Sequence, residues 1–89
     1  MHKKWSEEAW ADYIYWQGED KKTLKKINEL IKSIERDGES KGIGKPEALK
    51  GDRSGFYSRH IDDKNRLIYR VIDNVLEIAA CREHYSDKN

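Results

Sequence analysis

The sequence predicts an α+β fold in which two N-terminal helices pack on one face of a four- to five-stranded, mainly antiparallel sheet. Residues 6–38 contain two stretches whose apolar side chains recur at helical spacing. Residues 56–82 contain three short runs rich in aromatic and β-branched residues. The polar segments between these runs are short, which favours hairpins. Two amphipathic helices must cover an apolar surface, and the predicted sheet provides it.

A single domain is expected, because 89 residues leave room for one hydrophobic core. This domain spans residues 1–89, with a flexible tail over 86–89. The sequence is 39% charged and 36% hydrophobic, yet three Trp and five Tyr supply large apolar surfaces. The single cysteine, Cys81, excludes an internal disulfide, and the first residues lack the apolar stretch of a signal peptide or membrane helix. These features predict a cytoplasmic protein with no membrane association.

An edge strand over residues 2–5 and a first helix are expected at the start of the chain. Ser6 is a good N-cap, and the two glutamates that follow it favour the first helical turn. We expect this helix to run to Gln17 and to end at Gly18. Its apolar residues are mostly aromatic: Ala9, Trp10, Tyr13, Ile14 and Trp16. Core packing is the favoured interpretation of this stripe.

The second helix is expected to begin at the cap Asp20 and to stop at Gly38. One of its faces is apolar: Leu24, Ile27, Leu30, Ile31 and Ile34. Residues 38–46 combine three of the six glycines with the only proline, so they predict a flexible loop that leads into 47–50. This loop lacks the fixed glycine and lysine spacing of a phosphate-binding P-loop.

The three predicted strands span 56–61, 66–72 and 75–82, after a turn at 52–55. Side chains alternate along a strand, so Tyr57 and Arg59 share one face of the first run. Arg66, Ile68 and Arg70 likewise share one face of the second. The helices cover one side of the sheet, and the polar residues are expected to converge on the other side.

Positive charge is concentrated in the middle of the chain. The formal net charge of +1 gives no argument for a nucleic-acid partner. Residues 41–70, however, contain eight Lys or Arg against four Asp or Glu, whereas residues 1–40 contain eight against nine. A polyanion would therefore meet residues 41–70. The alternative interpretation, a stretch that is merely solvated, is the more common one for basic segments.

RNA can be cleaved without a metal, because its own 2′-hydroxyl is the nucleophile once a base removes the proton and an acid protonates the departing 5′ oxygen. An arginine can hold the phosphate and stabilise the transition state through paired hydrogen bonds. Glu47, Arg66 and His84 meet this specification. No metal or other cofactor is expected, because the three histidines are scattered and the cysteine lies within a predicted strand.

Motifs spread over nearly the whole chain support a more specific interpretation: Trp5–Glu8, Trp10, Asp12–Tyr13, Tyr15–Gln17, Lys25–Lys32, Gly44–Glu47, Ser54–Phe56, Arg66–Leu67 and Ala79–Tyr85. In these motifs the chain resembles the YoeB toxins, ribosome-dependent mRNA interferases within the RelE-like superfamily. The resemblance implies a compact antiparallel sheet with two helices on one face, similar to small microbial ribonucleases. This fold agrees with the one predicted from periodicity.

The resemblance also implies roles for individual residues. Glu47 of the Lys-Pro-Glu motif acts as the base, Arg66 stabilises the phosphate, and His84 of the closing His-Tyr pair acts as the acid. The supporting residues orient phosphates or position the nucleotide: Lys50, Arg59 and Tyr85. Cleavage is expected in the ribosomal A site and leaves a 2′,3′-cyclic phosphate.

The implied partners are a YefM-type antitoxin, the ribosome and mRNA, and a homodimer is compatible with the family. Trp10 and Trp16 are candidates for the antitoxin surface. The alternative function is that of a non-catalytic translation inhibitor that occupies the ribosome, or of a co-repressor acting with its antitoxin. Two features depart from the family pattern: the extra residues 86–89, and His60, which stands where a second arginine is common.

Overall fold

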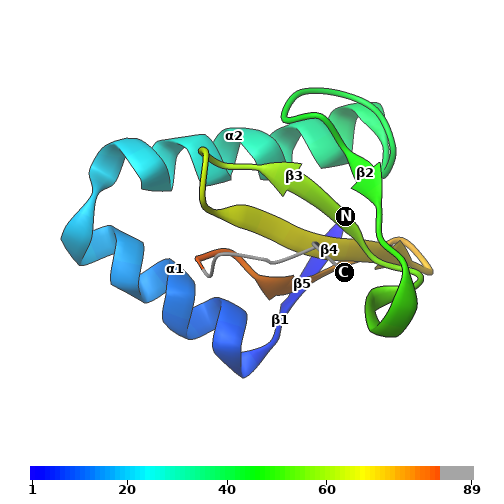
Figure 1. Ribbon diagram of the computed structural model, residues 1–89, viewed down its shortest axis with the longest axis horizontal. Coiled ribbons are helices and arrows are strands. Elements are labelled where there is room, and N and C mark those ends of the chain that lie inside the picture. The colour runs from blue at the N-terminus through cyan, green and yellow to red at the C-terminus, as the bar shows by residue number, and fades with distance from the viewer. Residues whose placement is uncertain (83–89) are drawn as a thin grey trace.

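The computed structural model describes residues 1–82. Its helices and strands follow the chain in this order: β1 (His2–Trp5), α1 (Glu7–Glu19), α2 (Lys21–Asp37), β2 (Glu47–Ala48), the 3-10 turn η1 (Gly51–Arg53), β3 (Tyr57–His60), β4 (Arg66–Ile72) and β5 (Val75–Ala80). The strands form a single sheet in the order β1-β5-β4-β3-β2. Both helices lie on the same face of this sheet (Figure 1).

The sheet is antiparallel except at one edge. Strands β2 to β5 form a meander of antiparallel pairs, whereas β1 pairs with β5 in parallel, with His2 opposite Val75 and Trp5 opposite Ile78. The predicted α+β architecture is therefore confirmed, with five strands in a mixed sheet. β1 is an edge strand, as the sequence predicts, and its partner is the last strand of the chain.

The main core lies between the helices and the sheet. It consists of apolar residues from α1, α2 and the helix-facing side of the strands, the most buried of which are Ala9, Ile27, Leu30, Ile34, Leu67, Tyr69, Leu76, Ile78 and Cys81. A second, smaller cluster of Leu49, Ile68 and Ala80 lies elsewhere in the sheet. Over residues 1–82, no helix is both long enough and apolar enough to cross a membrane.

The two helix starts are where the sequence predicts them. The Ser6 hydroxyl accepts a hydrogen bond from the Ala9 amide, and the Asp20 carboxylate accepts from the Lys22 and Thr23 amides. The Thr23 hydroxyl also donates to Asp20, and these hydrogen bonds lower the pKa of that carboxyl group. The predicted end of α1 is two residues too early. Gly18 stays helical, and α1 ends only where the Asp20 amide donates to the Trp16 carbonyl.

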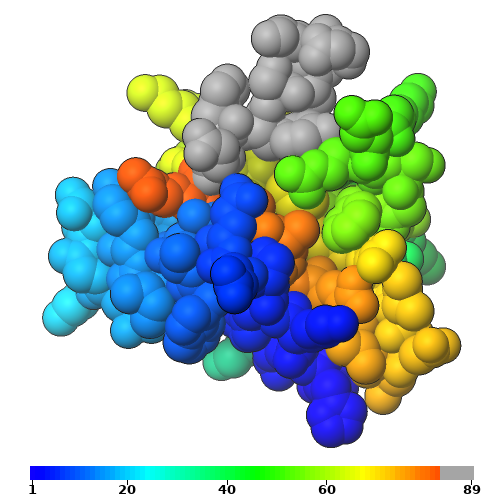
Figure 2. Space-filling view, turned by 90° about the horizontal axis from the view of Figure 1, so that it is seen from below, coloured from blue at the N-terminus to red at the C-terminus, as the bar shows by residue number. Residues whose placement is uncertain are grey.

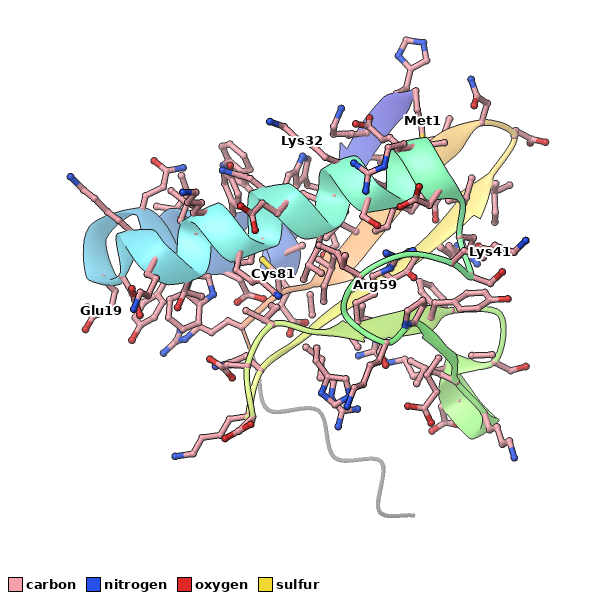
Figure 3. The ribbon with its side chains drawn as sticks, turned by 90° about the horizontal axis from the view of Figure 1, so that it is seen from above. Met1, Glu19, Lys32, Lys41, Arg59 and Cys81 are labelled. Atoms are coloured by element: carbon pink, nitrogen blue, oxygen red, sulfur yellow. The ribbon has the colours of Figure 1, made fainter. Side chains whose placement is uncertain are left out.

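Strand β5 ends at Ala80, two residues before the predicted end. The reason is that the amide and the carbonyl of Cys81 are both hydrogen-bonded to side chains of α1. The Asp12 carboxylate accepts from the Cys81 amide at 2.9 Å, and the Trp16 indole donates to the Cys81 carbonyl at 2.9 Å. Cys81 therefore leaves the hydrogen-bond ladder of the sheet and is held against α1. Its side chain is completely buried (Figure 3).

We predict that Cys81 will not react with thiol reagents while the chain is folded. Burial raises the pKa of its thiol to about 12, and the Asp12 carboxylate adds to the shift. A raised pKa keeps the thiol protonated at pH 8, and the thiolate is the reactive form. Dithionitrobenzoate at pH 8 should therefore label the denatured chain within minutes and the native chain only at the rate of unfolding. Rapid labelling of the native chain would contradict this environment.

Candidate active site

The face of the sheet opposite the helices carries the residues that matter for the predicted chemistry. Tyr57 packs into the helix-side core. Side chains alternate along a strand, so Ser58 and His60 belong to the opposite face. Cross-strand partners share a face, and Ser58 pairs with Ile68 while His60 pairs with Arg66. We call this surface the open face. Seen from below, α2 is largely hidden, α1 and β1 form the blue part of the surface, and the segment before β3 with β4 and β5 forms much of the rest (Figure 2).

Glu47 and Arg66 both belong to the open face, although 18 residues lie between them in the sequence. Glu47 of β2 is opposite Ser58 of β3, and Ser58 is opposite Ile68 of β4. Arg66 is two residues before Ile68 on that strand. Two strand spacings and two residue rises separate their Cα atoms by roughly 12 Å. Both side chains are long, so a ribose and its phosphate fit between them.

The hydroxyl of Ser58 lies in the row between these two residues. Ser58 is 1% exposed, and its Oγ has no hydrogen-bond partner among residues 1–82. The rest of this row is apolar, because Ile68 and Ala80 continue it across β4 and β5. The floor of the open face is therefore closely packed, and its polar groups stand at the margins.

A tight turn fixes the start of β4, where Arg66 lies. The Asp62 carboxylate accepts hydrogen bonds from the Lys64 amide at 2.8 Å and from the Asn65 amide at 2.6 Å. Burial tends to raise the pKa of Asp62, but these hydrogen bonds outweigh it and lower the pKa. The Ile61 amide closes the hairpin on the Asn65 carbonyl. Residues 61–65 therefore hold the end of β3 and the start of β4 in a fixed register.

Lys50 is exposed just after β2. Next to it, Leu49 is buried against Ile68 and Ala80, and its amide donates to the Phe56 carbonyl at 2.9 Å. The Lys50 carbonyl accepts from the Arg53 amide at the start of η1. Burial of Leu49 thus fixes the backbone, while the Lys50 side chain stays available to solvent. Residues 38–46 form a loop, as the sequence predicts, and the two-residue strand β2 follows it at Glu47–Ala48.

Arg59 does not have the exposure that its predicted role requires. It is 0% exposed and lies under the loop between α2 and β2 (Figure 3). Its guanidinium donates to four loop carbonyls, those of Gly38, Glu39, Lys41 and Ile43. A phosphate could not reach a group buried in this way. The expectation that Arg59 orients a phosphate is therefore wrong for this fold, in which Arg59 organises the loop.

Side chains complete the buried surroundings of Arg59. Its Nε donates to the Tyr69 hydroxyl at 2.8 Å, and one terminal nitrogen donates to the Ser33 hydroxyl at 2.9 Å. Burial raises the pKa of Tyr69, although the guanidinium opposes this shift. Ser33 in turn donates to Asp37, whose pKa is lowered by hydrogen bonds from Arg36 and Ser33. The positive charge is thus compensated by carbonyl dipoles and by a nearby carboxylate.

Two glycines in the loop between α2 and β2 are the sequence signal that the loop packs closely over Arg59. Gly42 and Gly44 have φ angles of 114° and 86°, which favour glycine. A side chain at Gly42 would collide with Ser33, and one at Gly44 would collide with Leu30. The loop backbone therefore approaches α2 and Arg59 closely. Alternation along β3 also placed Arg59 on the face of Tyr57, but did not indicate that this is the covered face.

His84 and Tyr85 lie outside the described residues. The last described residues are well anchored, because the Ser6 hydroxyl donates to the Ala79 carbonyl at 2.8 Å and α1 holds Cys81. The guanidinium of Arg82 lies 3.6 Å above the ring of Tyr15. Helix α1 thus fixes the chain immediately before the segment that carries the predicted acid.

The aromatic stripe of α1 divides into buried and exposed residues. Trp16 is 8% exposed and belongs to the core, whereas Trp10 is 50% exposed. Trp10 lies beside Trp5 and Tyr13, with ring centroids 5.8 and 6.0 Å away. The interpretation as core packing is therefore confirmed for Trp16. Of the two tryptophans proposed as docking candidates, Trp10 alone has substantial exposure.

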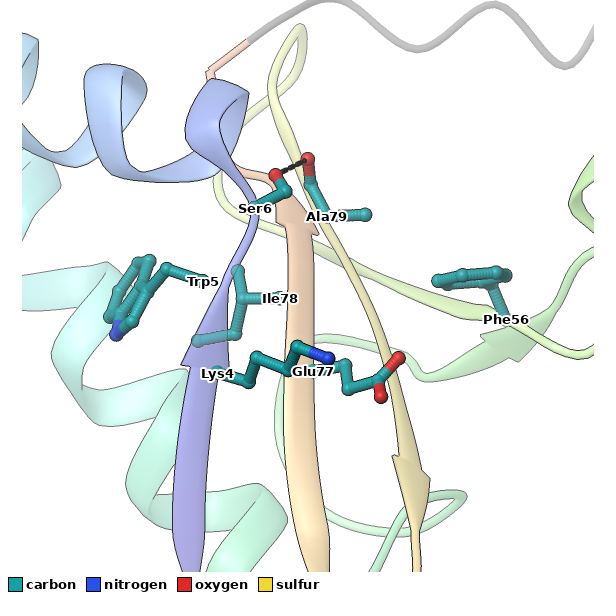
Figure 4. Close-up of a pocket in the computed structure, with 7 residues that line it drawn as sticks. All are labelled: Lys4, Trp5, Ser6, Phe56, Glu77, Ile78 and Ala79. Carbon is teal, nitrogen blue, oxygen red and sulfur yellow. Dashed lines mark hydrogen bonds between the residues drawn. The ribbon is translucent and has the colours of Figure 1, made fainter.

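A hollow of about 160 Å³ lies at another part of the open face, between β1 and Phe56 (Figure 4). Its polar margin is formed by Lys4 and Glu77, which are cross-strand partners. Arg70 pairs with Glu77 at 2.7 Å and lies 4.6 Å above the Phe56 ring. The predicted site residues that the structure describes, Glu47, Lys50, Arg59 and Arg66, do not line this hollow. In residues 1–82, no group of three or more His, Cys, Asp or Glu is arranged to hold a metal ion.

Comparison with known proteins identifies the family. Residues 5–85 match the family described as YoeB-like toxins of bacterial type II toxin-antitoxin systems. The chain belongs to this family. It is 58% identical over 81 residues to Toxin YoeB of Escherichia coli strain K12, which covers 91% of this chain and 95% of that toxin. The predicted resemblance to the YoeB toxins is therefore confirmed.

Solved structures support the same assignment. The toxin in a heterotetrameric YoeB-YefM complex from Staphylococcus aureus has 52% sequence identity and a TM-score of 0.90, covering 96% of this chain and 98% of that one. A YoeB dimer from the same organism has 52% identity and a TM-score of 0.89, with the same coverage. This chain thus has the YoeB fold, and it is a toxin of a type II toxin-antitoxin system.

Proposed function

We propose that this YoeB-family toxin is an endoribonuclease that cleaves mRNA in the ribosomal A site without a metal and thereby inhibits translation. The toxin class follows from the family, whereas the reaction is our inference from the residues. The observation that supports it most is the cross-strand register, in which Glu47 and Arg66 share the open face with a gap the size of a nucleotide.

The proposed reaction uses groups that the chain itself supplies. Glu47 removes the proton from the 2′-hydroxyl, whose oxygen attacks the adjacent phosphorus. Arg66 binds the non-bridging oxygens and stabilises the additional negative charge of the pentacoordinate transition state. His84 gives a proton to the departing 5′ oxygen. The P–O5′ bond breaks, and the products are a 2′,3′-cyclic phosphate and a free 5′-hydroxyl.

Two further residues support substrate binding in this proposal. Lys50 is exposed three residues after Glu47, so its ammonium can meet a neighbouring phosphate of the same strand. Tyr85 follows the acid directly in the sequence and stacks on or positions a nucleotide. Arg59 has no part in substrate binding.

The proposed partners follow from the related complexes. The Staphylococcus aureus toxin is bound to YefM in one solved structure and forms a dimer in another. We propose a YefM-type antitoxin for this chain, with the exposed Trp10 as a candidate contact, and a homodimer as one of its assemblies. Action on ribosomes and mRNA places the toxin in the cytoplasm.

The decisive experiment measures cleavage of a defined mRNA on programmed ribosomes. Magnesium is kept at the level that holds the ribosome together, and EDTA removes trace transition metals. We predict that the wild-type chain cleaves under these conditions and that Glu47→Ala and His84→Ala lower the rate at least about 10²-fold, since each removes a proton-transfer group. Glu29→Ala is the matched control, because Glu29 is an exposed glutamate of α2.

Ribosome binding is measured in parallel by sedimentation. Wild-type protein that binds ribosomes and blocks translation without cutting mRNA would instead establish the non-catalytic inhibitor. Cleavage that depends on a specific divalent ion, after the ribosome is held intact by other cations, would contradict the metal-independent chemistry. Equal loss of activity in Glu29→Ala would show that the effect of Glu47→Ala is not specific.

A further inference from the structure

The Ser58 hydroxyl is the only side-chain oxygen or nitrogen of residues 1–82 that is buried without a hydrogen-bond partner. An unpaired buried hydroxyl lowers stability, and such groups are rare in folded proteins. The other buried serine, Ser33, shows the usual arrangement. Its hydroxyl donates to Asp37 and accepts from Arg59 and from the Ile43 amide. Ser58 therefore needs an explanation other than the stability of the fold.

Backbone pairing places Ser58 beside the proposed base. Ser58 of β3 lies directly opposite Glu47 of β2, and directly opposite residues share a face with Cβ atoms about 5 Å apart. The Leu49 amide, which donates to the Phe56 carbonyl at 2.9 Å, continues this register beyond the short strand. A glutamate side chain is long enough to bring its carboxylate over a serine in this position. The relative placement of the two side chains is thus set by the sheet.

Glu47 is the cross-strand neighbour of Ser58 that can accept its proton. The other described neighbours across the two strand pairs lack a side-chain acceptor, because they are aliphatic or arginine: Leu49, Ile68, Arg66 and Arg70. The backbone carbonyls of the strands point within the sheet toward the paired strands. A hydrogen bond donated by Ser58 to a cross-strand side chain therefore goes to the Glu47 carboxylate.

We propose that Ser58 is a positioning residue for Glu47. When RNA covers the open face, the Ser58 hydroxyl donates a hydrogen bond to the Glu47 carboxylate and holds it against the 2′-hydroxyl. Bound RNA displaces water from the exposed carboxylate, and hydrogen bonds in a catalytic site tighten when the substrate is in place. The hydroxyl is neutral, so it orients the carboxylate without cancelling its charge. This inference rests on the proposed nuclease function and concerns the same site.

The test compares Ser58→Thr with Ser58→Val, two side chains of the same shape that differ in one hydroxyl. Single-turnover cleavage of mRNA on programmed ribosomes is measured over a range of toxin concentrations. We expect Ser58→Thr to cleave within about threefold of the wild-type rate and Ser58→Val about tenfold more slowly than Ser58→Thr, since a misplaced base slows the reaction. The toxin concentration at half-maximal rate should agree within about twofold. Ser58→Ala, which cannot overfill the site, should match Ser58→Val.

Urea denaturation separates positioning from a structural role. Because the hydroxyl is unpaired in the folded chain, Ser58→Val should be at least as stable as Ser58→Thr. Ser33→Ala should instead lower the stability, since Ser33 is equally buried but hydrogen-bonded. A Ser58→Val chain that is less stable than Ser58→Thr would overturn the proposal, because the hydroxyl would then support the fold.

The same pair of variants in a Glu47→Ala background tests whether Ser58 acts through Glu47. There we expect equal residual rates for threonine and valine at position 58, and a tenfold difference that persists would overturn the proposal. Equal rates for the two variants in the otherwise wild-type chain, which itself cleaves mRNA, would retain the nuclease and reject the role of Ser58. A wild-type chain that does not cleave on ribosomes would reject the nuclease and this inference with it.

Discussion

Arg66→Lys should lower the rate of mRNA cleavage about 10²-fold while leaving the fold unchanged. Arginine presents two parallel N–H groups to the oxygens of a phosphate, whereas lysine offers a single point charge. Loss of a donor aimed at developing negative charge typically costs a factor of this size in rate. Single-turnover cleavage on programmed ribosomes measures it, because binding and product release then do not limit the rate.

Arg70→Lys provides the matched control on the same strand. Arg70 also belongs to the open face, but its guanidinium pairs with Glu77 and lies over Phe56, at the hollow rather than beside Glu47. Lysine can keep the ion pair with Glu77, so we expect a rate within about threefold of the wild type. A near-normal cleavage rate for Arg66→Lys would contradict the proposed role of Arg66 in stabilising the transition state.

Arg59→Met should destabilise the folded chain by about 3–5 kcal/mol, the range found when one member of a buried charged network is removed. Methionine fills part of the space but donates no hydrogen bond. Four loop carbonyls and the Ser33 and Tyr69 hydroxyls would lose a buried donor. A domain of this size is stable by only about 5–10 kcal/mol. Urea denaturation followed by circular dichroism measures the change.

Two further variants serve as controls for Arg59→Met. Arg59→Lys keeps the charge but cannot reproduce the planar set of donors, so it should be intermediate in stability. Arg36→Met removes an arginine whose side chain is 66% exposed in an ion pair with Asp37, and it should change stability little. If Arg59→Met were as stable as Arg36→Met, the hydrogen bonds to the loop would not hold the fold together.

Local features of the fold were predictable because the signals are local. Ser6 and Asp20 have side chains that accept hydrogen bonds from the first helical turn, so the helix starts follow from residue type alone. Strand β4 was predicted with its observed bounds, since short turns precede and follow it. The end of β5 was missed because it depends on contacts with α1, which hold Cys81. The end of α1 was missed because Gly18 remains helical and the helix continues to the residue before Asp20.

The site was predictable only in part, because alternation distinguishes two faces of a strand without showing which one the helices cover. Arg59 is a charged residue on the covered face, where apolar residues are the rule. The carbonyls that satisfy it come from a loop 15 or more residues earlier. The register that brings Glu47 near Arg66, and His60 opposite Arg66, is likewise set by tertiary pairing.

The parallel pairing of β1 with β5 has a consequence for synthesis of the protein. Within residues 1–82, strand β1 pairs only with residues 75–78, so during synthesis it must wait until β5 has left the ribosome. Contacts between such distant positions slow folding. A nascent or prematurely terminated chain that ends before residue 75 has an unpaired first strand and lacks the histidine at position 84. We therefore expect a chain truncated in this way to be less stable and unable to carry out the proposed cleavage.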